Sequence, residues 1–234
     1  DDLEMAVSAG IDGVLVPKIT RGKDVRAVNR FLNDAGASPD LGLWVMIETP
    51  LAILNIKKIA KAAAKTRLAG FVMGTNDLAK ELRSPLVPSR HPLVPHLATA
   101  LLAAREAGKM ILDGVYNDVK NPEGFVAECR QGMEMGFDGK SCIHPTQIET
   151  IHRVFSSTPE EIEWARRVLS GWSDLDGERT GVVVVDGEMI EALHVELAER
   201  ILARAPRSGR AAGPQSEPRA PGSSTPGGGT RCRT

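Results

Sequence analysis

The sequence predicts an α/β protein whose strands lie parallel in one sheet, and three observations support this. Short apolar runs alternate with longer amphipathic segments, the runs begin 26 to 40 residues apart, and they show no polar alternation. A strand that is apolar at successive positions is typical of a sheet buried on both faces. The spacing fits a strand followed by a crossover helix, which joins parallel neighbours.

The expected elements alternate along the chain. Each expected strand ends in Pro-Lys, Glu, Gly, Asp-Gly or His, and three of the expected helices stop before a glycine, which is the usual left-handed helix end. The expected strands are 13–18, 43–48, 69–74, 109–114 and 139–144. The expected helices are 24–35, 51–64, 91–107, 122–135 and 158–169. Beyond Ser170 the alternation ends, and a short strand and turn over 181–190 precede a last helix over 189–203.

Five strand–helix units are visible, whereas a closed (β/α)8 TIM barrel has eight in ~250 residues. The chain also opens directly in helix-like sequence. We therefore expect a partial barrel that lacks about the first three strands. The predicted organisation is a catalytic domain over 1–155, a C-terminal helical extension or lid over 156–205, and a disordered tail over 206–234.

Composition excludes several classes of protein. The 234 residues carry 29 Lys+Arg against 30 Asp+Glu, a formal net charge of -1, so no overall positive field would attract nucleic acid. No apolar stretch is long enough for a membrane span. Three cysteines without zinc-ligand spacing indicate a reducing compartment, and the N-terminus does not resemble a signal peptide. We expect a cytoplasmic protein.

The last segment, 206–234, differs from the rest. It holds five Pro and six Gly residues, with five Arg against one Glu. Such a composition cannot bury enough apolar surface to offset the entropy of ordering. A basic tail could bind nucleic acid or a partner, but a solvated extension is the simpler interpretation.

Chemistry is expected at the carboxyl ends of the strands, where loops of a parallel α/β fold gather. Two carboxylates, Glu48 and Asp77, end neighbouring strands. Adjacent strands lie about 4.8 Å apart, so both side chains could reach one cation. Oxygen ligands with open positions suit Mg²⁺. Helix capping by Asp77 and a structural Glu48 are the alternatives.

Other strand-end residues have simpler interpretations beside functional ones. Lys18 could form a Schiff base, or could place a positive charge beside a carboxylate or phosphate. Asp113 is interpreted as a loop anchor and His144 as structural, although either could be functional. Cys142 is expected to be a small core residue within an apolar strand.

Five ordered motifs give the chain a resemblance to a known family. It resembles the HpcH/HpaI aldolase/citrate lyase family, in its CoA-ester lyase branch, which includes citrate lyase beta subunits and malyl-CoA or citramalyl-CoA lyases. The resemblance covers about residues 1–204. The motifs are IET at 47–49, GTNDL at 74–78, LDGVYND at 112–118, GFDGKSCIHPTQI at 136–148 and VDGEMIE at 185–191.

The resemblance implies a TIM barrel of the phosphoenolpyruvate/pyruvate superfamily type and a Mg²⁺-dependent carbon–carbon lyase. Glu48 and Asp77 would bind the metal, and Thr49, Asn76 and Lys18 would help them bind substrate. The substrate would be a 3-hydroxy-3-carboxyacyl-CoA such as malyl-, citramalyl- or citryl-CoA, cleaved to an acyl-CoA and a small oxo acid. Family members use an aspartate as acid/base group near the C-terminus, often across a subunit boundary.

This sequence departs from the family pattern in two places. Glu191 stands at the position of that aspartate, one methylene longer, and is our candidate catalytic residue. A substrate-binding arginine of the family lies in strands that we expect this chain to lack, so we expect the truncated chain itself to be inactive.

Three alternatives remain open at this stage. They are a CoA-independent class II pyruvate aldolase, a malyl-CoA thioesterase, and a non-catalytic subunit that binds acyl carriers. The resemblance also implies a homo-oligomer, a trimer or hexamer.

Overall fold

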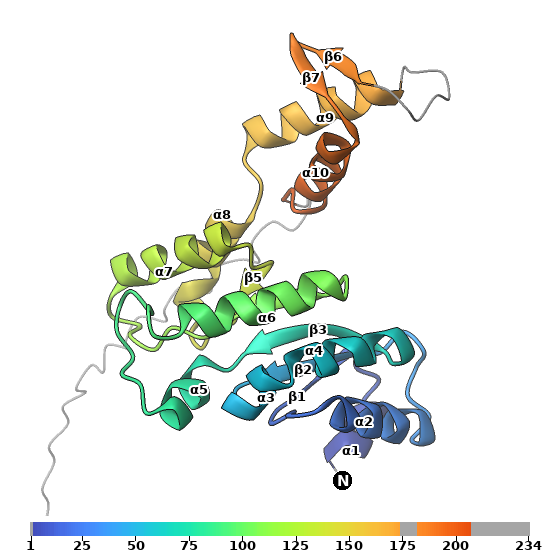
Figure 1. Cartoon of the computed structure of the whole chain (residues 1–234), viewed down its shortest axis with the longest axis vertical. Coiled ribbons are helices and arrows are strands. Elements are labelled where there is room, and N and C mark those ends of the chain that lie inside the picture. The colour runs from blue at the N-terminus through green and yellow to red at the C-terminus, as the bar shows by residue number, and fades with distance from the viewer. Residues whose placement is uncertain (1, 174–181, 207–234) are drawn as a thin grey trace, which may run out of the picture.

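The protein is built on a five-stranded parallel sheet (Figure 1). The computed structural model describes residues 2–173 and 182–206. The strands lie in chain order and each pairs in parallel with the next, as predicted. They are β1 (Gly13–Val16), β2 (Gly42–Ile47), β3 (Leu68–Met73), β4 (Met110–Asp113) and β5 (Gly139–Lys140).

Helices connect successive strands, which makes this an α/β fold. Figure 1 shows α3, α4 and α6 lying over β2 and β3. The helices of this part are α1 (Asp2–Ser8), α2 (Gly22–Asp34), α3 (Pro50–Leu54), α4 (Ile56–Ala60), α5 (Thr75–Leu82), α6 (Val94–Glu106), α7 (Pro122–Met135) and α8 (Ile148–Phe155), with 3₁₀ turns η1 (Lys61–Lys65) and η2 (Pro145–Gln147).

The core is thickest around the middle strands, where side chains are removed from water on both faces. In β3, five of six residues are buried, and Phe71 and Ile111 are among the largest fully buried side chains. β1 differs from the expectation of a strand buried on both faces, because Leu15 is 42% exposed. Within the described residues β1 pairs only with β2, so it forms an edge of the sheet.

Two predicted elements are shorter or more broken than expected. The helix expected over 51–64 is divided into α3, α4 and η1, with the first break at Asn55, whose side-chain amide donates to the Thr20 carbonyl. The last strand of the parallel sheet, β5, ends at Lys140, four residues earlier than predicted. Cys142 therefore lies beyond the sheet and is exposed, so its assignment to the core was wrong.

A second group of elements follows α8. It consists of α9 (Pro159–Ser173), the antiparallel hairpin β6 (Val183–Val185) and β7 (Glu188–Ile190), and α10 (Ala192–Ala203). These elements enclose a hydrophobic cluster of their own around Val168, Ile190 and Ala198. Met189 lies in β7, so the last helix begins three residues later than predicted.

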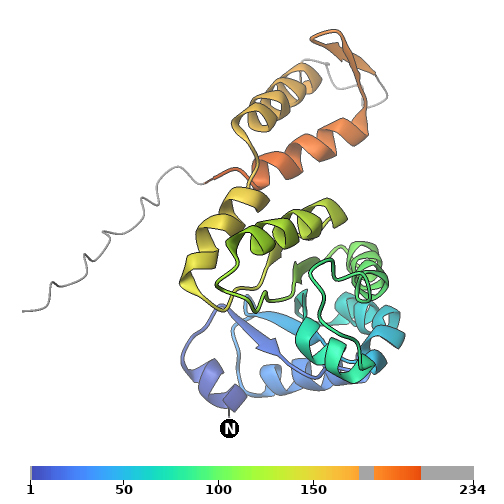
Figure 2. The same cartoon turned by 90° about the vertical axis from the view of Figure 1, so that its left-hand side faces the viewer.

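The second group extends beyond α8, away from β1, in both views (Figure 2). The Ser157 hydroxyl donates to the Ile201 carbonyl at 2.8 Å and ties the connecting segment to the end of α10. The predicted domain boundaries stay predictions. Most of the predicted tail, residues 207–234, lies outside the described residues.

The described helices do not include a candidate membrane span. Among residues 2–173 and 182–206, none forms a helix that is both long and apolar enough to span a bilayer.

Candidate active site

The predicted carboxylate pair lies at the carboxyl end of the sheet. Glu48 follows β2 directly, and only 2% of the residue is exposed. Its Oε1 accepts a hydrogen bond of 2.7 Å from the backbone amide of Lys18, which follows β1. Asp77 lies in the first turn of α5, immediately after β3. The two acids thus come from adjacent strand ends, as the sequence predicts.

Lys18 joins the two carboxylates. Its ammonium Nζ lies 2.9 Å from Asp77 Oδ1 and 3.8 Å from Glu48 Oε1. The backbone of Lys18 has φ +57°, a left-handed conformation that is uncommon outside glycine and is frequent at functional sites. One positively charged atom therefore interacts with both acids.

The carboxylates differ in environment. Burial is the main cause that raises the pKa of Glu48 above its ordinary value, although the Lys18 amide opposes the shift. The hydrogen bond from Lys18 lowers the pKa of Asp77 and raises that of Lys18. A Schiff-base lysine needs a lowered pKa, so this arrangement favours a charge-placing role for Lys18.

The residues present fit a hard divalent cation. Two carboxylates already share one cationic atom, and each supplies the oxygen ligands that Mg²⁺ prefers. The described part of the chain contains no group of three or more His, Cys, Asp or Glu residues placed for metal binding. Mg²⁺ retains several waters and takes substrate oxygens, so two protein carboxylates are a sufficient anchor.

Gly74 allows this close arrangement between β3 and α5. A Cβ at Gly74 would collide with the Glu48 Cβ and would come within 2.9 Å of Glu48 Oε2. Only a residue without a side chain leaves Glu48 its position. The glycine of the GTNDL motif is therefore explained by packing against the candidate ligand.

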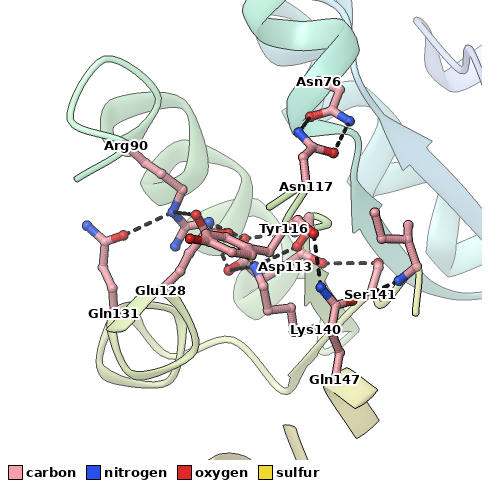
Figure 3. Close-up of polar contacts among 12 residues, drawn as sticks. Asn76, Arg90, Asp113, Tyr116, Asn117, Glu128, Gln131, Lys140, Ser141 and Gln147 are labelled. Carbon is pink, nitrogen blue, oxygen red and sulfur yellow. Dashed lines mark hydrogen bonds and ion pairs between the residues drawn. The ribbon is translucent and has the colours of Figure 1, made fainter. Parts of the chain in front are cut away.

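Thr49 and Asn76, predicted to bind substrate, both have local partners. Thr49 caps α3, with Oγ1 accepting from the Ala52 amide at 3.0 Å. Asn76 exchanges two side-chain hydrogen bonds with Asn117, at 2.9 and 2.8 Å. Asn117 lies in the loop after β4, so the amide pair connects that loop to the residue beside Asp77 (Figure 3).

Sequence reasoning missed a network of buried charges at the ends of β4 and β5. Asp113 accepts from Arg90 Nη1 at 2.8 and 2.9 Å and from Lys140 Nζ at 3.1 Å. Lys140 also donates to Glu128 Oε1 at 2.7 Å. Figure 3 shows these side chains converging from three elements and a loop. Two positive and two negative charges balance one another.

The network confirms Asp113 as an anchor and extends its role. Arg90 has φ +51°, and its Nη2 is buried without a hydrogen-bond partner among the described residues. Sequence periodicity could not pair Arg90 with Asp113, because the arginine lies in an irregular loop. The strand-end position of Lys140, within GFDGKSCIHP, was the one available signal.

His144 is exposed and forms the N-cap of η2, where its Nδ1 accepts from the Thr146 amide at 3.3 Å. This agrees with a structural role. Gln147, buried one turn later, donates to the Tyr116 carbonyl at 3.0 Å. The HPTQ segment thus supports the same loop that carries Asn117.

Glu191 lies apart from the carboxylate pair. It is the exposed N-cap residue of α10, and its backbone amide donates to His194 Nδ1 at 2.9 Å. The group of elements that carries Glu191 is separated from β2 and β3 in both views. Within one chain the structure does not bring Glu191 to Glu48 and Asp77.

Comparison with known proteins identifies close relatives. A sequence model of the HpcH/HpaI aldolase/citrate lyase family matches residues 1–145. A (3S)-malyl-CoA thioesterase of Cereibacter sphaeroides is 48% identical over 204 residues, which cover 87% of this chain and 68% of the relative. Citrate lyase subunit beta of Escherichia coli K12 is 36% identical over 214 residues, covering 89% and 70%.

Solved structures agree with this assignment. The CitE protein of Mycobacterium tuberculosis, in complex with magnesium, acetoacetate and coenzyme A, superposes with a TM-score of 0.62 at 27% identity, covering 83% of this chain and 68% of that one. A citrate lyase from Burkholderia xenovorans LB400 gives a TM-score of 0.65 at 21% identity, covering 86% and 65%. The second likeness bears on the fold alone.

Proposed function

The chain belongs to the HpcH/HpaI aldolase/citrate lyase family, and we propose that it is a magnesium-dependent carbon–carbon lyase that cleaves a 3-hydroxy-3-carboxyacyl-CoA. The relatives are citrate lyase beta subunits and a malyl-CoA thioesterase, and a lyase activity fits that membership. The observation that carries the proposal is the carboxylate pair at the strand ends, Glu48 and Asp77, bridged by Lys18.

In this proposal Glu48 and Asp77 hold the metal. A bound Mg²⁺ would polarise the carbonyl of the small oxo acid and offset the negative charge that develops on its oxygen. A related structure contains magnesium together with acetoacetate and coenzyme A, which supports this assignment. The buried position of Glu48 keeps its carboxylate in one orientation, since the Lys18 amide holds Oε1.

The chain's other residues act on orientation and charge. Lys18 would remain protonated, because Asp77 raises its pKa, and would attract the carboxylate of the substrate. The Asn76–Asn117 pair would keep the start of α5 at a constant position beside the loop after β4. Products would be an acyl-CoA and a small oxo acid such as glyoxylate, pyruvate or oxaloacetate.

Glu191 would exchange the proton of the acyl-CoA product, acting on the site of a second copy of the chain. The separation of α10, which Glu191 caps, from β2 and β3 within one chain supports this arrangement. So do apolar side chains exposed on the same elements, since Val184 is 68% and Met189 64% exposed. Exposed apolar groups of this kind are frequent at protein interfaces. We therefore propose a homo-oligomer.

Thioester hydrolysis is a second candidate, because the relative with 48% identity is a malyl-CoA thioesterase. The products distinguish the two reactions. Retro-aldol cleavage of malyl-CoA gives acetyl-CoA and glyoxylate, and no free thiol appears. Hydrolysis consumes water and gives malate and CoA, whose thiol is detected by a chromogenic disulfide.

The experiment follows glyoxylate and free thiol in parallel, with Mg²⁺ or EDTA. Glyoxylate formation that EDTA abolishes supports the lyase, and thiol release without glyoxylate supports the thioesterase. Cleavage of a CoA-free hydroxy oxo acid instead would indicate a pyruvate aldolase. Mn²⁺ affinity, which does not require turnover, is measured as well, by electron paramagnetic resonance. Asp77→Asn should weaken it at least about tenfold, and unchanged affinity would contradict the metal assignment.

A further inference from the structure

A basic cleft opens between the start of α2 and the helix α4, outside the carboxylate pair. It has a volume of about 460 Å³. Five of its seven lining residues are basic, and the remaining two are Gly22 and Asn55. The basic residues are Arg21, Lys23, Arg26, Lys58 and Lys61.

Ion pairing does not neutralise these five side chains within the described residues. In the described ranges, none of them takes part in an ion pair, although ion pairs occur elsewhere on the surface, as between Arg105 and Asp138. The nearby acid is Asp24, which accepts from the Thr20 and Arg21 amides and offsets part of the charge of Lys23. A strong positive potential therefore remains in the cleft.

The walls of the cleft are held by backbone packing. A Cβ at Gly22 would collide with the Lys58 carbonyl, so α2 begins in direct contact with α4. The Asn55 amide donates to the Thr20 carbonyl at 3.1 Å and joins the same two segments. The cationic side chains thus start from a frame whose spacing is set before any ligand binds, which lowers the entropic cost of binding.

We propose that this cleft binds a small molecule that carries two or more phosphate groups. Several unpaired cations around one hollow favour a multivalent anion, since each phosphate oxygen accepts charge-assisted hydrogen bonds from Arg and Lys. The positive end of the α2 dipole adds to the attraction. The source is either the nucleotide part of a CoA thioester or a free phosphorylated compound.

The test is calorimetric titration of the full chain with inorganic pyrophosphate, CoA and dephospho-CoA in EDTA. EDTA removes divalent cations, so no metal held by Glu48 and Asp77 can bind the probes. The result therefore does not depend on the proposed lyase activity. Binding should weaken at least about tenfold in Arg21→Gln/Lys58→Gln. It should also weaken as salt is raised.

A matched control removes the same charge elsewhere, with Lys120→Gln/Arg130→Gln on exposed surfaces. This variant should bind within about twofold of the unaltered chain. If CoA binds more tightly than pyrophosphate and dephospho-CoA, the ligand is the CoA nucleotide. If all three probes bind equally, the ligand is a free phosphorylated compound. No binding by any probe, or equal weakening in both double variants, would overturn the proposal. Circular dichroism checks that each variant is folded.

Discussion

Lys140 is more deeply buried than Arg90, the other cation in the charge network at the ends of β4 and β5. Its side chain is 0% exposed, and its ammonium contacts Asp113, Glu128 and the Gly114 carbonyl. Burying four charges is costly, and the network is tolerable because each charge faces an opposite one. Removing one member leaves an uncompensated charge in a dry site.

We therefore expect Lys140→Met to lower the free energy of unfolding by about 3–5 kcal/mol. Adding Glu128→Gln to that variant should recover part of the loss, because the charges balance again. Urea denaturation followed by circular dichroism measures both. Lys120→Met, at an exposed position, is the control and should change stability by less than about 0.5 kcal/mol. A Lys140→Met loss no larger than the control would contradict the network's role.

Two cysteines should differ in reactivity. Burial raises the pKa of Cys129 to about 11, whereas Cys142 is exposed. Because the thiolate is the reactive form, a thiol reagent at pH 8 should modify Cys142 quickly and Cys129 only after denaturant is added. The measurement uses a Cys232→Ser background, since Cys232 lies outside the described residues. Equal rates at both thiols in the native protein would contradict this expectation.

At the scale of elements, the loop after β4 supports the start of α5 through the Asn76–Asn117 pair. Its two hydrogen bonds should be worth about 1 kcal/mol in coupling. A double-mutant cycle with Asn76→Ala and Asn117→Ala should show that coupling in Mn²⁺ affinity, while the melting temperature changes little. Coupling seen in the melting temperature alone would make the pair a purely structural contact.

Strand-and-helix alternation was enough to predict the sheet and the two acids at its carboxyl end. Glu48 and Asp77 were found because each lies at the carboxyl end of an apolar run, Asp77 three residues beyond it, and parallel strands bring such positions together. Arg90 and Glu128 were missed because one lies in an irregular loop and the other within an ordinary amphipathic helix. Neither local pattern records the tertiary contact that each residue makes, since Arg90 pairs with Asp113 and Glu128 pairs with Lys140.

The edge strand of the sheet and the limits of the helices were predicted less well than the central strands. The apolar sequence of β1 indicates a buried strand, yet burial depends on what lies beside it, and β1 pairs only with β2 in the described part. The break at Asn55 depends on its hydrogen bond to the Thr20 carbonyl, a tertiary contact that helix propensity does not include.

For the whole molecule, two hydrophobic clusters imply two units of stability. The larger surrounds the parallel sheet and the smaller lies between α9, the hairpin and α10. The link between them includes hydrogen bonds from Ser157 to the carbonyls of Ile201 and Arg204. Units joined by few contacts often open independently.

Ile190→Ala should therefore unfold the smaller unit and leave the sheet intact. Ile190 is 1% exposed in the smaller cluster, and its truncation should cost about 2–5 kcal/mol, much of what so small a unit can supply. Hydrogen exchange read by mass spectrometry should show protection lost in α9, the β6–β7 hairpin and α10, and kept in β2, β3 and β4. Ile111→Ala, in the larger cluster, is the matched control and should lower protection across the sheet instead. Loss of protection throughout the chain in Ile190→Ala would mean that the two clusters fold as one, and the boundary predicted near residue 156 would have to be abandoned.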